Sequence, residues 1–283
     1  MKFVFTLAVA VLTLGTMLSA NEIPVKNGDK IAFLGDSITQ GGNSKPGGFI
    51  HLVIDGLKRN GVEAVPLCAG FSGYKSNGML ARVDKAVIEK KPQWMLLSCG
   101  VNDVWHGANG VPLEDYKKNI TALCDKVEKA GIKIMILTAT MIQEDPAHKL
   151  NQQLAPYNEF LRQFAKERNY LLADLNDRMQ KSVAQKTTRG NKLTVDGVHM
   201  NPKGNQMMAE GFLLAFGVPA EKVAGYPAIW DDFPNTSGTH FWVMFSVNEW
   251  KKITAEAAAR KTNPRQMLLD MLKKQVKEEI LNK

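Results

Sequence analysis

The sequence predicts a doubly wound α/β fold, with helices on both faces of a parallel sheet. Short, mainly apolar runs alternate with longer amphipathic segments between residues 30 and 217, and each run is flanked by glycine, proline or polar residues. Continuous apolar runs are typical of parallel strands that are buried on both faces, and strand–helix alternation produces right-handed crossovers. The expected strands are Lys30–Leu34, Ala64–Ala69, Trp94–Cys99, Lys133–Thr138 and Tyr170–Asp174.

Four longer segments between these strands have helical patterns. The expected helices are Gly48–Asn60, Glu114–Ala130, Asn151–Arg168 and Pro202–Phe216. In the second helix, Tyr116, Ile120, Leu123 and Val127 share one face, and Gly131 ends the pattern. The fourth helix has Asn201 as its N-cap and proline at its first position.

The N-terminal segment has the pattern of a secretory signal peptide. Lys2 precedes an uncharged apolar run from Phe3 to Leu18, and the small residues Ser19 and Ala20 precede a polar segment. The alternative is a membrane anchor, but the run is short for a span and no basic cluster follows it. We therefore expect residues 1–20 to be removed, leaving a secreted or periplasmic protein without a stable membrane anchor.

Length and composition allow a central domain at 21–218 and an extension at 219–283. The 283 residues carry a net charge of +8 that is spread along the chain, which is no footprint of nucleic-acid binding. Cys68, Cys99 and Cys124 are an odd number in apolar surroundings, and we interpret them as buried thiols.

The C-terminal extension departs from the strand–helix alternation. Residues 219–238 lack periodicity, His240–Val247 is typical of a strand, and two helices are expected at about 248–261 and 264–282. The last helix has one apolar face, formed by Leu268, Met271, Leu272, Val276 and Ile280. We expect this strand–helix–helix unit to pack on the central domain or to form a homodimer; a solvated helical extension is the alternative.

A candidate nucleophile follows the first strand directly. In Gly35-Asp36-Ser37, glycine allows the chain to turn sharply, so that Ser37 projects at the open edge of the sheet. The Ser37 hydroxyl and its backbone N–H then face the same space, which suits a nucleophile whose amide also stabilises an oxyanion. Taken alone, the tripeptide is equally compatible with a capped turn.

A candidate base lies at the far end of the domain, in Asp196-Gly197-Val198-His199. Histidine is suited to removing the serine proton near neutral pH, and an acceptor must fix its tautomer. Asp196 can reach back to the Nδ1 atom of His199 across the glycine turn. Taken alone, the segment is more often a surface turn, and the strand-end serine makes the catalytic interpretation preferable.

Two further loops offer oxyanion donors. Phe71-Ser72-Gly73 follows the second strand, and Gly100-Val101-Asn102-Asp103 follows the third. The Gly73 N–H and the Asn102 amide would join the Ser37 N–H as three donors. A glycine-rich turn and an Asx turn are the structural alternatives.

In this order, G-D-S, F-S-G, G-V-N-D and D-G-V-H resemble the four sequence blocks of the GDSL/SGNH hydrolase superfamily, over about residues 29–217. The resemblance implies a flavodoxin-like three-layer α/β/α sandwich with about five parallel strands. It assigns the four named roles to Ser37, Gly73, Asn102 and His199, with Asp196 supporting His199, and it implies no metal or cofactor. The sequence departs from the family pattern at Ile38-Thr39, Cys68 and Tyr74.

Residues close to these blocks are candidates for the substrate pocket: Asp36, Tyr74, Trp105 and His106. The loop at 143–150 follows the fourth strand and should rim the site with polar side chains, Glu144 and His148 among them. A polar rim without a long apolar lid suits a small acyl group on a polar alcohol.

The expected activity is therefore ester hydrolysis through an acyl-serine intermediate, with short acyl groups, above all acetyl groups on carbohydrate, as the substrate. The partner is then a small-molecule or carbohydrate ester rather than a nucleic acid. Lysophospholipase or thioesterase activity is the alternative within the same family. A non-catalytic glycan-binding protein and an acyltransferase to a sugar hydroxyl remain open.

Overall fold

The computed structural model describes residues 23–185, 192–233 and 243–282, so the expected signal peptide at 1–20 lies outside the described residues. Its centre is a five-stranded sheet, in which every pairing is parallel and the strand order is β2-β1-β3-β4-β5. The strands are β1 Lys30–Gly35, β2 Val65–Gly70, β3 Trp94–Ser98, β4 Lys133–Leu137 and β5 Leu171–Ala173. All five expected strands are confirmed, with ends that differ by one residue at most.

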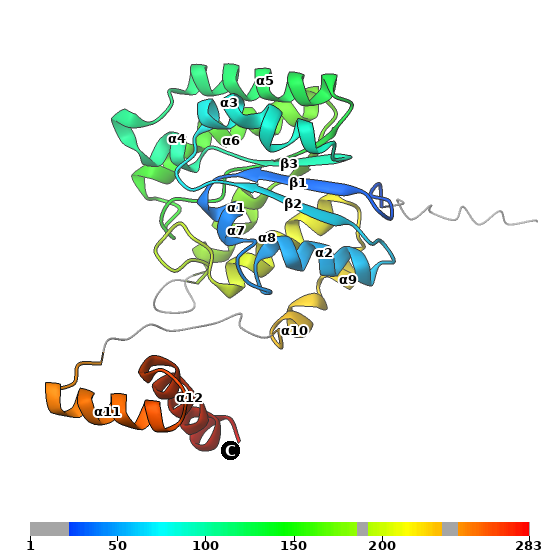
Figure 1. Ribbon diagram of the computed structural model, residues 1–283. Coiled ribbons are helices and arrows are strands. Elements are labelled where there is room, and N and C mark those ends of the chain that lie inside the picture. The colour runs from blue at the N-terminus through cyan, green and yellow to red at the C-terminus, as the bar shows by residue number, and fades with distance from the viewer. Residues whose placement is uncertain (1–22, 186–191, 234–242, 283) are drawn as a thin grey trace, which may run out of the picture. The chain divides into compact units, whose positions relative to one another are not determined.

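Helices cover both faces of the sheet, which confirms the three-layer sandwich (Figure 1). One face carries α3, α5 and α6, and the other carries α2, α7 and α8. The bounds are α2 Phe49–Arg59, α3 Ser76–Ala86, α5 Leu113–Lys129, α6 Lys149–Glu167, α7 Leu175–Ala184 and α8 Pro202–Ala215. Short helices α1 Ser37–Gly41 and α4 Val101–Trp105 follow β1 and β3, and short 3-10 turns lie at Ile88–Lys90 and Gly107–Asn109.

Aromatic packing fixes strand β1 against its helices. Phe33 of β1 meets Phe49 of α2 and Phe212 of α8 edge to face, and these two rings stack at a centroid distance of 5.4 Å. All three side chains are fully buried. Because such rings remove large apolar areas from water, this contact holds β1 rigidly and fixes where its carboxyl end emerges.

The strand order is the flavodoxin order, in which the chain direction across the sheet reverses between β1 and β3. Ligands in open α/β sheets bind at this switch point, beyond the carboxyl ends of the strands. The short helices that begin at Ser37 and Val101 start there. Two of the sequence-predicted site residues, Ser37 and Asn102, are therefore brought to the same crevice by topology.

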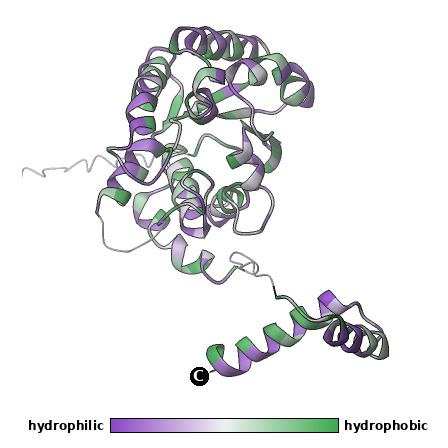
Figure 2. Cartoon of the chain, turned by 90° about the vertical axis from the view of Figure 1, so that its left-hand side faces the viewer, coloured by the Kyte–Doolittle hydropathy of each residue, from purple (hydrophilic) through white to green (hydrophobic). Residues whose placement is uncertain are grey.

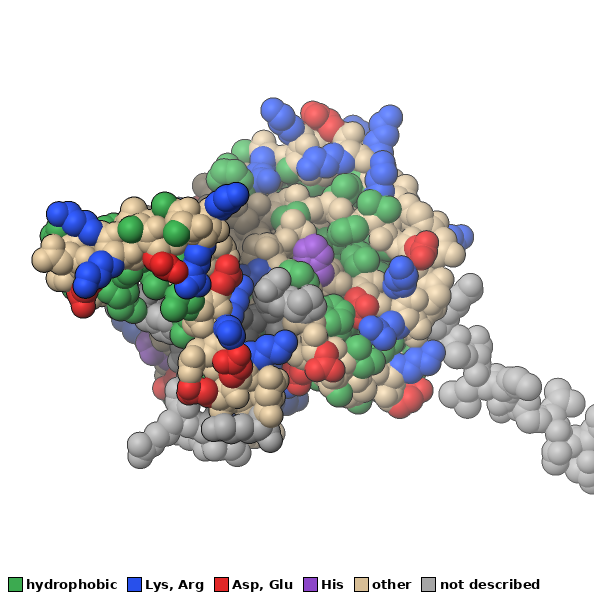
Figure 3. Space-filling model, turned by 60° about the horizontal axis from the view of Figure 1, so that its bottom comes forward, with side chains coloured by type: hydrophobic (Ala, Val, Ile, Leu, Met, Phe, Trp, Pro, Cys, Tyr) green, Lys and Arg blue, Asp and Glu red, His purple; other side chains and the backbone are tan. Residues whose placement is uncertain are grey.

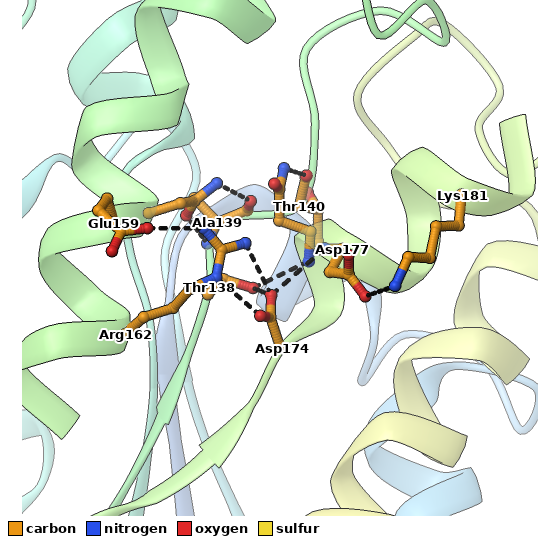
Figure 4. Close-up of polar contacts among 10 residues, drawn as sticks. Thr138, Ala139, Thr140, Glu159, Arg162, Asp174, Asp177 and Lys181 are labelled. Atoms are coloured by element: carbon orange, nitrogen blue, oxygen red, sulfur yellow. Dashed lines mark hydrogen bonds and ion pairs between the residues drawn. The ribbon is translucent and has the colours of Figure 1, made fainter. Parts of the chain in front are cut away.

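A partly buried polar cluster ties α6 to the carboxyl ends of β4 and β5 (Figure 4). Asp174 accepts hydrogen bonds from Arg162, at 2.7 and 3.0 Å, and from the Thr138 hydroxyl at 2.9 Å. Burial alone would raise the pKa of Asp174, but the Arg162 guanidinium and the N–H and hydroxyl donors outweigh it and hold that pKa below its usual value. The pair fixes α6 against this edge of the sheet.

The chain after α8 remains packed on the central domain for a further stretch. Helices α9 Ala220–Val223 and α10 Tyr226–Trp230 lie here, and Tyr226 and Trp230 are buried. The Trp230 indole N–H donates to Asp55 of α2 at 2.8 Å. The first compact unit reaches Ser237, so packing continues past residue 218, where we expected the extension to begin.

The second compact unit, residues 238–283, contains a helical hairpin of α11 Val247–Ala259 and α12 Pro264–Val276, followed by a π-helical turn at Lys277–Leu281. The expected strand His240–Val247 is wrong where it is described: residues 243–246 have no regular structure and Val247 begins α11. Ser246 and Glu249 form a capping box, which starts a helix where a strand would need a partner. Residues 240–242 lie outside the described residues.

The hairpin keeps much of its apolar surface open. Met271, Leu272, Val276 and Ile280 of the expected apolar face are all exposed, and apolar and polar residues alternate along both helices (Figure 2). Among the helices of the described residues, none is both long and apolar enough to cross a membrane.

Candidate active site

A serine, a histidine and an aspartate from distant parts of the sequence line up at the carboxyl edge of the sheet. The Ser37 hydroxyl lies 2.9 Å from Nε2 of His199, and Nδ1 of the same ring lies 2.6 Å from Oδ2 of Asp196. Ser37 and His199 are both partly exposed, so the pair can reach a ligand. This is the arrangement in which a histidine can take the serine proton while a carboxylate holds its tautomer.

The segment that carries Asp196 and His199 closes on itself like a small hairpin. Thr194 and Met200 form an isolated antiparallel bridge, and the Val195 N–H donates to the His199 carbonyl at 2.8 Å. At the tip, Oδ1 of Asp196 accepts from the N–H groups of Val198 and His199 at 3.0 and 2.8 Å. We call residues 193–201 the Asp–His arm.

Hydrogen bonds within this arm keep the Asp196 carboxylate ionised. Burial alone would raise its pKa, but the backbone N–H and ring of His199 and the N–H of Val198 outweigh that effect. The net result is a pKa of Asp196 below its usual value. An ionised carboxylate is what an imidazolium partner requires.

Asp36 lies beneath the site rather than on its surface. Its side chain is only 3% exposed; Oδ1 caps the Ile38 N–H at 2.9 Å and Oδ2 faces the Asn102 amide at 3.3 Å. Burial raises the pKa of Asp36 to about 6, although the Ile38 N–H and the charge of His199 favour the ionised form. We expected Asp36 to line the pocket, but the structure gives its carboxylate partners inside the protein.

Asn102 connects the segments that carry Asp36 and Tyr74, and Gly73 directly precedes Tyr74. The Asn102 amide nitrogen donates to Asp36 and to the Tyr74 carbonyl, and its oxygen lies 3.2 Å from Nε2 of His106. His106 therefore contacts Asn102 itself and fixes which way the amide points. Gly73 has φ +76°, a left-handed conformation that favours glycine, and open space surrounds its Cα.

Exposed aromatic rings rim the crevice. Trp105 is 39% exposed, and its ring centroid lies 6.2 Å from that of His199. Tyr74 packs edge to face on Phe71, which is 52% exposed, and the Arg82 guanidinium stacks over both rings. Our sequence reasoning did not select Phe71; an aromatic residue between Gly70, which ends β2, and Gly73 was the available signal.

The sequence predicted that polar side chains of the loop after β4 rim the site. In the structure, several of these side chains form hydrogen bonds with the protein backbone. His148 caps α6 through the Leu150 N–H, and Asp145 caps the Ala147 N–H. Glu144 reaches across to the start of the Asp–His arm, where it accepts one hydrogen bond from Lys192, just before the arm, and three from Leu193 and Thr194. No sequence pattern indicated that contact, because residues 144 and 194 are far apart in the chain.

The described residues offer no candidate metal centre. Within residues 23–185, 192–233 and 243–282, no group of three or more His, Cys, Asp or Glu side chains is arranged to hold a metal ion. On the face shown in Figure 3, Lys/Arg and Asp/Glu side chains are interspersed. All three cysteines are free thiols. Cys99 and Cys124 are buried as expected, which raises their pKa, but Cys68 is only partly buried.

Comparisons with known proteins agree with this geometry. Residues 33–207 match the GDSL-like lipase/acylhydrolase family. An acetylxylan esterase from Geobacillus stearothermophilus is 26% identical over 214 residues, which cover 68% of this chain and 96% of that protein. Esterase TesA from Pseudomonas aeruginosa is 29% identical over 105 residues, covering 37% of this chain and 51% of that protein.

Solved structures extend the likeness to three dimensions. A crystal structure of the acetyl xylan esterase AlAXEase superposes with a TM-score of 0.61 at 31% identity, over 66% of this chain and 98% of that chain. A crystal structure of the G. stearothermophilus acetylxylan esterase superposes with a TM-score of 0.63 at 25% identity. The match covers 69% of this chain and 97% of that chain.

Fold and comparisons together define a serine hydrolase that acts on carboxylic esters. The chain belongs to the GDSL-like lipase/acylhydrolase family, as the resemblance of its four sequence blocks predicted.

Proposed function

We propose that this esterase removes acetyl groups from carbohydrate through an acyl-enzyme on Ser37. The alignment of Ser37, His199 and Asp196, at 2.9 and 2.6 Å, is the observation that carries the mechanism. The substrate class rests on two supports: the relatives named as acetylxylan esterases, and the exposed rings of Phe71 and Trp105 at the rim. Flat aromatic rings offer the apolar contact on which a sugar face packs.

The first half of the reaction acylates the enzyme. His199 Nε2 takes the Ser37 proton as the serine oxygen bonds to the ester carbonyl carbon, and the carbonyl oxygen becomes an oxyanion. N–H donors from Ser37, Gly73 and Asn102 stabilise that charge. When the tetrahedral species collapses, the bond to the sugar oxygen breaks, and that oxygen leaves with the proton from His199.

The second half repeats these steps with water. His199 takes a proton from a water molecule as the water oxygen bonds to the acyl carbon. The same N–H donors hold the new oxyanion. Collapse returns the proton to Ser37 and releases acetate. Asp196 stabilises the imidazolium in both halves without itself taking the proton.

The Asn102 amide must rearrange for this role, because both of its N–H groups have partners without substrate. The contact with Asp36 is the longer of the two, 3.3 Å against 3.1 Å to the Tyr74 carbonyl. It is therefore the one that an incoming oxyanion displaces most easily. Oxyanion binding and the environment of Asp36 are coupled through this side chain.

Activity profiling of the purified chain tests the proposal. We expect release of acetate from acetylated xylooligosaccharides and a rate on p-nitrophenyl esters that falls as the acyl chain lengthens, with Ser37→Ala inactive on both. A preference for long acyl chains would favour the lysophospholipase or thioesterase alternative. Sugar binding without turnover by the wild-type chain would favour a glycan-binding protein, and acetyl transfer to an added sugar would favour an acyltransferase.

We also propose that residues 1–20 direct export and are then removed. The supporting observation is the sequence pattern of Lys2, the apolar run and the small residues at 19 and 20. N-terminal sequencing of protein recovered outside the cytoplasm should begin near Asn21. Recovery of chains that retain Met1 would contradict this proposal.

A further inference from the structure

We propose that Glu144 is a positioning residue for the reaction: its carboxylate sets the geometry of the Asp–His arm, residues 193–201. The inference rests on the role proposed for His199 and Asp196. Glu144 contacts neither side chain and lies on the loop after β4.

The Glu144 carboxylate gathers four donors from three consecutive residues. Oε2 accepts from the Lys192 N–H at 2.5 Å, and Oε1 accepts from the N–H groups of Leu193 and Thr194 at 2.8 and 2.6 Å. The Thr194 hydroxyl adds a fourth hydrogen bond at 2.7 Å. A carboxylate has about four lone-pair positions, and bonds to an ionised acceptor are shorter and stronger than neutral ones. The Glu144 carboxylate therefore has enough lone pairs for all four donors, and its negative charge strengthens each of these bonds.

The Thr194 hydroxyl passes this restraint on toward the catalytic side chains. While its proton points to Glu144, its oxygen accepts from the Gly197 N–H at 3.0 Å, between Asp196 and His199. From the neighbouring residue, the Gln143 N–H donates to the Gly197 carbonyl at 2.7 Å. The loop after β4 thus holds the arm at its base and at its tip.

That loop is itself anchored to α6. Asn151, which is buried, donates to the carbonyls of Gln143 and Asp145 and accepts from the Ile142 N–H. Further back, buried Asn158 bonds the N–H and the carbonyl of Ala139, next to the Asp174–Arg162 pair that Figure 4 shows. Glu144 is therefore carried by a rigid support.

Packing holds the arm only in part. Leu193 and Val198 are buried, but Val195 is 67% exposed, and the side chains of Asp196 and His199 are also open to solvent to a large extent. Exposed stretches of a loop open easily unless hydrogen bonds hold them. Because a misplacement of about 1 Å can cost on the order of 10²-fold in rate, the four bonds to Glu144 matter for catalysis.

The direct test is Glu144→Gln, which keeps the shape and removes the charge. One of its terminal atoms becomes an NH₂ group, which leaves at least one backbone N–H of residues 192–194 without an acceptor. On p-nitrophenyl acetate we expect kcat to fall roughly 10- to 100-fold with KM little changed. Asp145→Asn is the matched control: it removes the same charge from the same loop, and the Asp145 side chain accepts only from the Ala147 N–H.

A double-mutant cycle tests the relay through Thr194. Thr194→Val keeps the side-chain volume but breaks the path from Glu144 to Gly197, and we expect a smaller loss of kcat. The double variant should lose about as much as Glu144→Gln alone, because the two residues act in one network. Fully additive losses would contradict the relay.

Two measurements separate positioning from general destabilisation. Thermal unfolding should show that Glu144→Gln is folded at the assay temperature. In wild type, proton NMR should show a low-field signal from the His199 Nδ1 proton bonded to Asp196, and this signal should broaden or move upfield in Glu144→Gln but not in Asp145→Asn.

The outcomes distinguish this inference from the proposed function. A fluorophosphonate probe that labels Ser37 in wild type and reacts roughly 10- to 100-fold more slowly with Glu144→Gln supports both. Equal labelling rates in wild type and Glu144→Gln, or equal slowing in Asp145→Asn, overturns the inference alone. Failure to label wild type overturns the proposed function itself.

Discussion

The Asn102 side-chain nitrogen lies 3.3 Å from the buried carboxylate of Asp36, and it also donates to the Tyr74 carbonyl. The proposed oxyanion donor Asn102 thus lies beside an acidic group whose pKa is about 6. The charge state of Asp36 therefore bears both on the stability of the fold and on the readiness of Asn102 to turn to a substrate.

Asp36→Asn should flatten the pH dependence of stability. The pKa of Asp36 rises from 3.8 to about 6 on folding, so between these pH values the folded protein holds a proton that the unfolded chain has lost. In wild type this group lowers the free energy of unfolding as the pH rises from about 4 to about 6, by about 3 kcal/mol in all. Asparagine still caps Ile38. Urea unfolding of both proteins across this range checks the difference; parallel curves would contradict it.

Asp196→Asn should lower kcat on p-nitrophenyl acetate by about 10²- to 10⁴-fold, because the amide neither selects the required tautomer of His199 nor stabilises its cation. Asp177→Asn, an exposed change in the first turn of α7, is the control and should leave the rate unchanged. Steady-state kinetics decide the matter. Near wild-type activity in Asp196→Asn would remove this residue from the mechanism.

Asn102→Ala should lower kcat by about 10²- to 10³-fold with little change in KM, since the lost donor acts on charge that develops only in the transition state. Asn119→Ala serves as the control, because Asn119 donates only to the Ser76 hydroxyl. A rise in KM at constant kcat would instead identify Asn102 as a contact for bound substrate.

Phe71→Ala should weaken action on a sugar ester more than on p-nitrophenyl acetate. The exposed ring would lose its contact with a sugar face, which we expect to lower kcat/KM for acetylated xylooligosaccharide about 3- to 10-fold. The quantity to compare is the ratio of kcat/KM for the sugar ester to kcat/KM for p-nitrophenyl acetate. Phe245→Ala, which changes an exposed phenylalanine in the second unit, is the control. An unchanged ratio would exclude Phe71 from sugar binding.

Gly70→Ala and Gly73→Ala should differ in kind. A Cβ at Gly70 would lie 2.3 Å from the Gln40 backbone nitrogen, so the turn that carries Ser37 must shift and fluorophosphonate labelling should slow. At Gly73 an added Cβ meets open space, and the left-handed φ costs about 1 kcal/mol of stability. Unfolding and labelling, measured on both variants, separate the two effects; equal labelling rates would refute the contrast.

The strands and the four long helices could be predicted because each carries a strong local pattern. Strand β3, for example, is a continuous apolar run that is buried throughout. Helices α3 and α7 were missed even though Met79 and Val83, and Met179 and Val183, repeat at helical spacing. Gly78 weakens the helical pattern of α3, and α7 is only 10 residues long, so local propensity alone does not distinguish either from a loop.

The candidate site divides in the same way. Ser37, Asn102, Asp196 and His199 could be found because each sits at a strand end or in a recognisable block. The burial of Asp36 and the contact between Glu144 and the Asp–His arm could not be predicted from the sequence, because both depend on which loops meet in space. Sequence patterns report the period of one segment and carry no direct information on contacts between distant loops.

The bridge between Thr194 and Met200 gives the Asp–His arm an independence of its own. Its turn is closed by its own backbone, and the loop after β4 holds it from outside through the Glu144 carboxylate and the Gln143 N–H. The proposed base and its acidic partner therefore lie in a locally closed segment of nine residues, whereas Ser37 begins the helix that follows β1.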